Sequence, residues 1–112
     1  MNNCLFCQII KKEIPAKIRY EEEDFLAFDD INPKAKVHIL IIPKKHLVSL
    51  DQATIADEPL LGKMMLLVVK LAKENKLENG FRVVINNKKH AGQIVDHLHL
   101  HLIGGQQLGP MA

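Results

Sequence analysis

The chain has no long hydrophobic run, few cysteines and almost no net charge. No run of about 18 apolar residues is present, and no basic segment precedes an apolar one at the start, so we expect neither a membrane span nor a signal peptide. A net charge of +2 with 25% charged residues indicates neither disorder nor a general nucleic-acid-binding surface. These absences favour a cytoplasmic protein that binds a small, specific ligand.

Cysteine is scarce, with two residues in a chain of 112. Two cysteines cannot build a disulfide framework, and the spacing of Cys4 and Cys7 is typical of a metal or redox pair. Hydrophobic residues make up 47% of the chain, which is enough for one core without disulfides. The sequence contains no internal repeat or linker, so residues 1–112 are expected to form a single domain.

What the sequence does contain is an alternation of histidine and leucine from His97 to Leu102. A period of two belongs to a β-strand, so we predict a strand over 97–102 with three available histidines on one face and three buried leucines on the other. The outer histidines would lie about 13 Å apart, too far for all three to bind one metal ion easily, although a pair could. A solvent-facing strand that merely carries histidines is the alternative interpretation.

Apolar spacing predicts two helices and four further strands. A short helix is expected over 4–12, where Pro15 stops it, and a long helix over 57–76, which Asp57 caps and whose first turn tolerates Pro59. The long helix is apolar almost all round, which favours contact with a second subunit or, alternatively, a larger core beneath a loop. The other strands are predicted at 17–22, 24–28, 37–42 and 81–85, with a turn at 29–33 and irregular segments at 86–93 and 106–112.

The histidines suggest chemistry at phosphorus. A neutral imidazole, with an ordinary pKa of about 6.5, is a competent nucleophile at pH 7, and the phosphorus–nitrogen bond it forms is labile enough for water to complete a hydrolysis. His99 is central, and His101 and His38 could hold phosphoryl oxygens or protonate a leaving group. The loop 86–93 is expected beside these histidines because the strands that flank it should pair antiparallel. Its amides, backbone N–H groups and glycine could bind a phosphate, although any hairpin could carry such Asn and Gly residues.

The histidine motif, preceded by Gly92-Gln93 and followed by Gly104-Gly105, resembles that of the histidine-triad (HIT) family. Segments 13–17, 30–33 and 38–46 resemble its Hint branch, so the resemblance covers nearly the whole chain. It implies an α+β fold of five antiparallel strands and two helices, joined into a ten-stranded sheet across a homodimer. It also implies hydrolysis of purine nucleoside phosphoramidates, which releases AMP or GMP and an amine through a nucleotidyl-histidine intermediate without a catalytic metal.

The resemblance assigns roles to individual residues. His99 matches the nucleophile, supported by His38, His97 and His101. Asp30 matches the residue that binds the ribose hydroxyls. The apolar slot for the base is matched by Phe6, Ile9, Phe28 and Ile31. The surroundings of the phosphate are matched by Asn86, Gly92, Gln93 and Val95. Without the resemblance, the four apolar residues would be interpreted as core packing and Asp30 as a turn residue.

Two positions depart from the family pattern. Ile94 stands where the family usually has a Ser or Thr hydroxyl that can bond the leaving group or a phosphoryl oxygen. The segment 106–112 lacks the Trp that close Hint relatives carry near the end, where it shapes the leaving-group side of the neighbouring site. Both departures concern the leaving group, so its handling is expected to differ.

A metal site is expected separately from the catalytic residues. The resemblance matches His46 and His97 to the histidines that join Cys4 and Cys7 around a zinc ion, and a closed Cys2His2 set is structural. The alternative is that the cysteines are small hydrophobic residues of the first helix. Two rival functions remain open: a purine-nucleotide-binding interaction module without catalysis, and a metal-dependent protein that uses the histidine strand.

Overall fold

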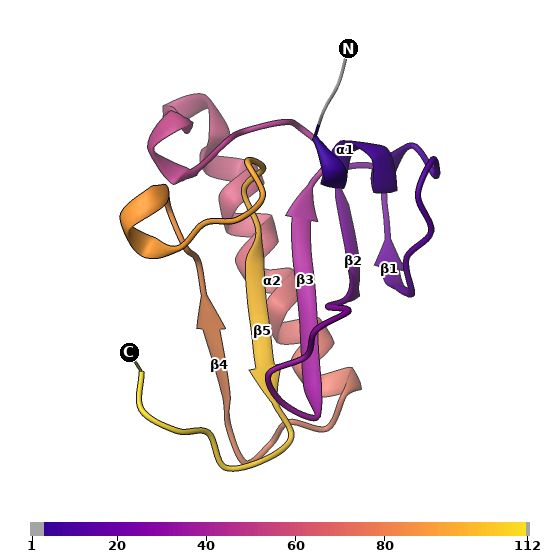
Figure 1. Ribbon diagram of the computed structural model, residues 1–112, viewed down its shortest axis with the longest axis vertical. Coiled ribbons are helices and arrows are strands. Elements are labelled where there is room, and N and C mark those ends of the chain that lie inside the picture. The colour runs from indigo at the N-terminus through magenta and orange to yellow at the C-terminus, as the bar shows by residue number, and fades with distance from the viewer. Residues whose placement is uncertain (1–3, 112) are drawn as a thin grey trace.

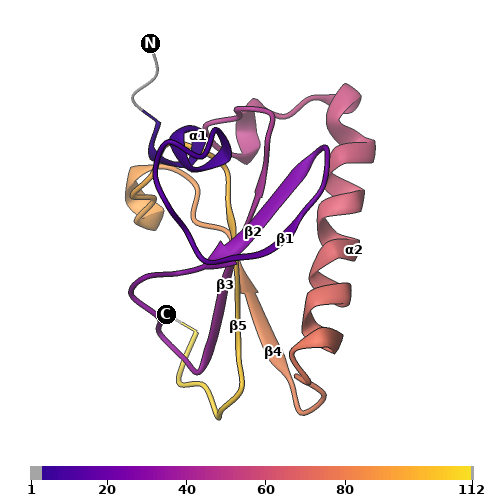
Figure 2. The ribbon, with the colours of Figure 1, turned by 90° about the vertical axis from the view of Figure 1, so that its right-hand side faces the viewer.

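The computed structural model describes residues 4–111 and contains one five-stranded antiparallel sheet with the strand order β1-β2-β3-β5-β4 (Figure 1). The strands are β1 (Ile18–Glu21), β2 (Phe25–Asp29), β3 (Val37–Pro43), β4 (Phe81–Val84) and β5 (Leu100–Gly104). The helix α2 (Glu58–Glu74) runs along one face of the sheet, and the short helix α1 (Leu5–Ile10) lies on the other face (Figures 1 and 2). The expected α+β fold of five antiparallel strands and two helices is confirmed.

Two hydrophobic clusters lie on the two faces of the central strands. On the α2 side, alternate residues such as Ile39 and Ile41 of β3 pack against Met64 and Leu71 of the helix. The intervening residues of β2 and β3 pack beneath α1, against Phe6 and Ile9. Burial on both faces explains why the predicted strand 37–42 is apolar throughout except for His38. Each fully buried Ile or Leu contributes about 1.5–3 kcal/mol through the hydrophobic effect.

The helices agree with the prediction, with shorter bounds and one different cap. The backbone of Lys12 takes a positive φ of 64°, so α1 ends before Pro15 can stop it. Asp57 directly precedes α2, and Pro59 lies in its first turn, as expected. The Asp57 carboxylate does not cap α2, however, because it accepts hydrogen bonds from Thr54 N (3.0 Å) and Lys45 Nζ (2.5 Å) instead.

The predicted histidine strand 97–102 is wrong at its first half, because β5 begins only at Leu100 and runs to Gly104. A long-range contact explains the difference: Leu98 N donates to Leu47 O (2.6 Å), so the backbone there bonds a loop and not a strand. The side-chain alternation nevertheless persists, since all three leucines are buried in the cluster on the α2 side. We expected His97 to be available on the surface of the strand, but its side chain is fully buried.

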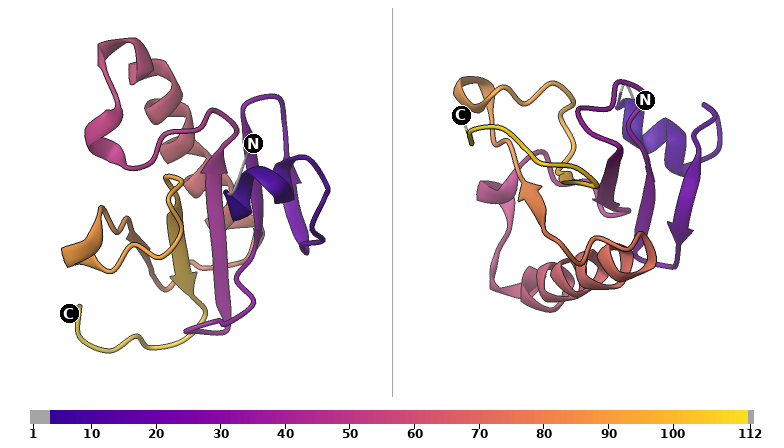
Figure 3. Two further views of the ribbon diagram at one scale, coloured as in Figure 1. Left: turned by 45° about the horizontal axis from the view of Figure 1, so that its top comes forward. Right: turned by 90° about the horizontal axis from the view of Figure 1, so that it is seen from below.

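The connections place three short 3-10 helices around one end of the sheet. These are η1 (Leu50–Gln52), η2 (Ile55–Asp57) and η3 (Lys89–Ala91). The loop that contains η3 lies on the same side of the sheet as α1, away from α2 (Figures 2 and 3). Within residues 4–111, no helix is long and apolar enough to cross a membrane.

Candidate active site

A cavity of about 500 Å³ lies on the side of the sheet away from α2. Its walls come from α1, the turn after β2, the strands β3 and β5, and the loop after β4. Eight of the nine expected nucleotide-binding residues line it: Phe6, Ile9, Phe28, Asp30, Ile31, Asn86, Gly92 and Val95. Three of the four expected catalytic histidines line it as well, namely His38, His99 and His101. The fold therefore brings residues from both halves of the chain to one concave surface.

The ring of His99 has a defined orientation. Its Nδ1 lies 2.7 Å from the carbonyl oxygen of His97, and because a carbonyl only accepts, Nδ1 must carry the hydrogen and donate it. The ring of Phe6 packs edge-on at 5.1 Å between centroids. Burial lowers the pKa of His99, which favours the neutral ring. His99 therefore holds an unprotonated Nε2 with a free electron pair.

His38 and His101 form a directed chain of hydrogen bonds. The backbone N–H of Lys34 donates to His38 Nδ1 (3.0 Å), so the hydrogen of the His38 ring sits on Nε2. That Nε2 lies 2.9 Å from His101 Nδ1, to which it donates. The hydrogen of His101 is consequently on Nε2. Burial lowers the pKa of both rings, that of His101 to about 4, so both are neutral donors at pH 7.

Asp30 closes a turn, as the sequence suggested, and also contacts the histidines of the cavity. One carboxylate oxygen accepts from Asn32 N (2.8 Å) and closes the turn before Pro33. The other oxygen lies 3.4 Å from His38 Nε2 at the edge of the cavity. Asp30 thus links a local turn to the histidine chain.

Apolar side chains around the cavity differ in their exposure. Phe6, Ile9 and Phe28 are buried, as the core-packing interpretation requires. Ile31 and Ile94 are 90% and 91% exposed although both line the cavity, so core packing is the wrong interpretation for Ile31. Exposed apolar residues beside a cavity are typical of a ligand-binding surface.

The sequence interpretation missed several cavity residues. Leu40 and Ile103 lie two residues beyond His38 and His101 on the same strands, so the strand period could have identified them. Lys34 also lines the cavity and is the one lysine among its lining residues within the described chain. No pattern in the sequence marks Lys34.

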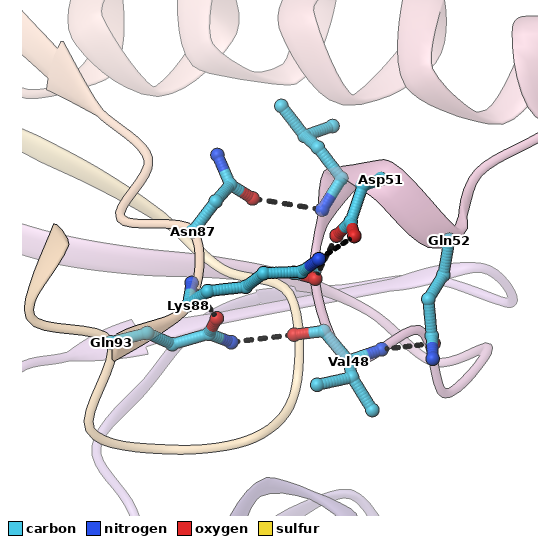
Figure 4. Close-up of polar contacts among 8 residues, drawn as sticks. Val48, Asp51, Gln52, Asn87, Lys88 and Gln93 are labelled. Atoms are coloured by element: carbon cyan, nitrogen blue, oxygen red, sulfur yellow. Dashed lines mark hydrogen bonds and ion pairs between the residues drawn. The ribbon is translucent and has the colours of Figure 1, made fainter. Parts of the chain in front are cut away.

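Gln93 is the expected nucleotide-binding residue that lies outside the cavity lining. Its amide bonds backbone groups of two loops, as Figure 4 shows. His97 also lies outside the lining, although its carbonyl orients His99.

The side chain of His97 belongs to a second cluster with Cys4, Cys7 and His46. Its Nδ1 lies 3.4 and 3.6 Å from the two sulfurs and 3.1 Å from His46 Nδ1, which in turn is 3.2 Å from Cys7 Sγ. A zinc ion with sulfurs at about 2.3 Å and nitrogens at about 2.0 Å would space its ligands about 3.3 to 3.8 Å apart in a tetrahedron. His97 Nε2 donates to Pro43 O (2.8 Å), which leaves Nδ1 unprotonated and directed at the cluster. The four donors fit such an ion.

The fold and the site together indicate the class of this protein: neutral histidines line an apolar cavity on the face of the five-stranded sheet opposite α2. The family model of the HIT domain matches residues 11–108. The chain therefore belongs to the HIT family.

Three comparisons illustrate the relationship. The chain is 51% identical to "Protein HitA" of Neisseria gonorrhoeae over 93% of its length and 97% of that protein. It is 41% identical to the "Purine nucleoside phosphoramidase" of Escherichia coli, over 96% of its own length and 91% of that protein. The crystal structure of a HIT family hydrolase from Legionella pneumophila superposes with a TM-score of 0.93 at 45% identity, covering 96% of both chains.

Proposed function

We propose that this protein hydrolyses purine nucleoside phosphoramidates at the phosphorus–nitrogen bond and releases AMP or GMP and an amine. The observation that carries the proposal is the orientation of His99, whose Nδ1–H is held by His97 O and whose Nε2 is free to attack. The name of the Escherichia coli relative, with 41% identity over nearly the whole chain, supports the same substrate class.

Each part of such a substrate finds complementary groups in the cavity. The purine fits between the apolar residues Phe6, Ile9, Phe28 and Ile31. The Asp30 carboxylate accepts hydrogen bonds from the ribose hydroxyls. The phosphoryl oxygens are stabilised by the Nε2–H of His101 and by backbone N–H groups of the loop that carries Gly92 and Val95.

Hydrolysis then takes two steps. Nε2 of His99 attacks phosphorus, the phosphorus–nitrogen bond breaks, and the leaving nitrogen takes up a proton from solvent, so that the products are nucleotidyl-His99 and a free amine. Water attacks the same phosphorus in the second step, breaks the bond to His99 and releases a proton to solvent. The products are a nucleoside monophosphate and the original imidazole, and the net co-reactant is one water. The neutral ring of His101 donates a hydrogen bond to the developing charge in both steps.

The test is the hydrolysis of adenosine 5'-monophosphoramidate by the wild-type protein and by His99→Ala. The substitution removes the nucleophile, so we expect kcat/KM to fall by about 10³-fold or more. The matched control is His90→Ala, since His90 is exposed and outside the cavity lining. Equal activity of wild type and His99→Ala would contradict the proposal. A wild type that binds purine nucleotides without turnover would instead identify a nucleotide-binding module, which is the second candidate function.

We also propose that Cys4, Cys7, His46 and His97 hold a structural zinc ion. Four protein donors complete a tetrahedron and leave no open position for a substrate, so a metal here stabilises the fold and performs no chemistry. The buried ring and the backbone of His97 would connect this centre to His99. Catalysis itself is proposed to use no metal ion.

A homodimer is the third part of the proposal. Met65, Leu66 and Val69 form an apolar stripe on α2 that faces away from the sheet, with 48%, 70% and 44% exposure. The neighbouring edge strand β4 adds Phe81, which is 44% exposed, and its edge could extend the sheet into that of a second copy. Leu66→Glu is expected to shift the mass measured by light scattering from dimer to monomer, whereas Lys63→Glu on another side of α2 is not.

A further inference from the structure

The loop 86–95 forms a wall of the cavity but has few apolar anchors of its own. Asn86, Gly92, Ile94 and Val95 line the cavity, whereas the residues 88–91 between Asn86 and Gly92 are exposed to solvent. Loops with few buried contacts are the segments that open most easily. The position of this wall must therefore depend on polar contacts.

Gln93 makes the most extensive of these contacts (Figure 4). Its side-chain oxygen accepts from Lys88 N (2.7 Å), which closes the loop on itself. Its side-chain nitrogen donates to Val48 O (2.5 Å) and to Val95 O (3.0 Å). One amide thereby joins both ends of the loop to the segment 47–52.

Two further side chains of the loop reach the same segment. Asn87 Oδ1 accepts from Leu50 N (2.8 Å), and Lys88 Nζ forms an ion pair with Asp51. The Lys88 ammonium lowers the pKa of the Asp51 carboxyl, in keeping with a charged contact. The segment 47–52 directly follows His46, and Leu47 O accepts from Leu98 N beside the catalytic histidines.

The hydrogen-bond inventory of Gln93 argues against direct contact with a phosphate. A glutamine amide has two hydrogens to donate, and both are used by Val48 O and Val95 O. The amide also lies outside the residues that line the cavity. A phosphate could gain a donor from Gln93 only if one of these bonds broke.

We propose that Gln93 is a positioning residue that fixes the wall Gly92–Val95 against the segment 47–52, and that it does not touch the substrate. Together with Asn87 it makes the geometry of the loop backbone that would face the phosphate depend on the segment 47–52, which directly follows His46. This inference rests on the proposed function for its effect on catalysis. The positioning of the loop itself can be measured without any substrate.

The test compares Gln93→Met with Gln52→Met, the same substitution within the same network. The side chain of Gln52 accepts from Val48 N (2.8 Å) inside its own segment, so the loss of this side chain leaves the bridge to the loop intact. In the free protein, hydrogen exchange of the amides 88–95 is expected to speed up about tenfold or more in Gln93→Met and less than about twofold in Gln52→Met. The Kd of AMP is expected to rise about tenfold in Gln93→Met alone.

A direct contact with phosphate predicts a different result: weaker AMP binding with unchanged exchange of the amides 88–95, which would overturn the proposal. Unchanged AMP binding would overturn it as well. The exchange readout does not depend on hydrolysis, so a protein without phosphoramidase activity would refute the proposed function and leave this test valid.

A milder variant guards against misfolding of Gln93→Met. Asn87→Ala removes one bond of the bridge and is expected to accelerate exchange of the same amides several-fold, by about a factor of three to five. Asn87→Asp should restore slow exchange, because a carboxylate oxygen can still accept from Leu50 N. Fast exchange in Asn87→Asp, or slow exchange in Asn87→Ala, would contradict the bridging role.

Discussion

Two groups of histidines lie on one side of the same sheet, and they differ in what surrounds them. His38, His99 and His101 line an open cavity, and hydrogen bonds fix which nitrogen of each ring carries the hydrogen. His46 and His97 instead converge with two sulfurs, since His97 Nδ1 lies 3.4 Å from Cys4 Sγ and His46 Nδ1 lies 3.2 Å from Cys7 Sγ. The first arrangement leaves reactive atoms free, whereas the second directs all its donors at one point.

His97 and His99 make the comparison sharpest, because they are two residues apart in one segment. His97 donates from Nε2 to Pro43 O and keeps Nδ1 for the sulfur cluster. His99 donates from Nδ1 to His97 O and keeps Nε2 free. The choice of carbonyl partner therefore distinguishes the proposed metal ligand His97 from the proposed nucleophile His99.

The largest effect that we expect is on stability, and it tests whether the group of Cys4, Cys7, His46 and His97 holds a metal ion. Replacing one ligand of the sulfur cluster, as in Cys7→Ser, or removing the metal with a chelator, is expected to lower the free energy of unfolding by about 3 kcal/mol or more. Metal content and thermal unfolding measure it. The control variant His101→Asn should still bind the metal ion, and its stability should still fall when a chelator is added. A purified protein that holds no metal and ignores the chelator would refute the structural zinc.

A smaller effect concerns the pH dependence of stability. Burial lowers the pKa of His101 from 6.5 to about 4, so between these values the unfolded chain binds a proton that the folded chain does not. The contribution of the neutral ring is present above pH 6.5 and is lost as the pH falls toward 4. Allowing for a partly exposed ring, we expect a loss of about 1–3 kcal/mol.

Denaturant unfolding at several pH values can isolate this contribution. His101→Asn should show a shallower loss of stability below pH 6.5 than the wild type, whereas the exposed-residue control His90→Asn should show the wild-type slope. Identical pH dependence in His101→Asn and the wild type would show that His101 is not held neutral by the fold.

The smallest effect that we expect is on substrate preference, and it concerns a residue that lines the cavity. Ile94 presents an exposed apolar side chain to the cavity at the position where the resemblance to the histidine-triad family led us to expect a hydroxyl. Ile94→Ser should shift the ratio of kcat/KM values away from substrates with an apolar amine and toward the unsubstituted phosphoramidate, by about tenfold. Ile55→Ser is the matched control, since Ile55 is 85% exposed but outside the cavity lining. An equal ratio in all three proteins would exclude Ile94 from leaving-group selection.

Local periodicity predicted most of the fold. The run Val37–Ile42 and the apolar spacing of 57–76 identified β3 and α2, because each pattern reflects which faces of the element are buried. The start of β5 could not be predicted, since it depends on the bond from Leu98 N to Leu47 O, fifty-one residues away in sequence. Contacts of that kind leave no periodic trace.

The candidate site was predicted through its motif more than through its physics. The alternation at 97–102 identified the histidines, but it predicted that all three lie on one face and are equally exposed. His97 is instead buried in the separate cluster with Cys4, Cys7 and His46. The partners that set each ring, such as Lys34 N and Pro43 O, are backbone groups. Residue patterns do not reveal backbone partners, because every residue type supplies a carbonyl and every type except proline supplies an N–H.

The most direct test of this division of roles is to map the covalent intermediate. The wild-type protein would be mixed with adenosine 5'-monophosphoramidate, quenched during turnover, digested and analysed by mass spectrometry. We predict an adenylyl group on His99 and on no other histidine, with the same site modified after chelation in whatever fraction of the protein stays folded. Turnover with an adduct on His97, on His101 or on no histidine would contradict the account.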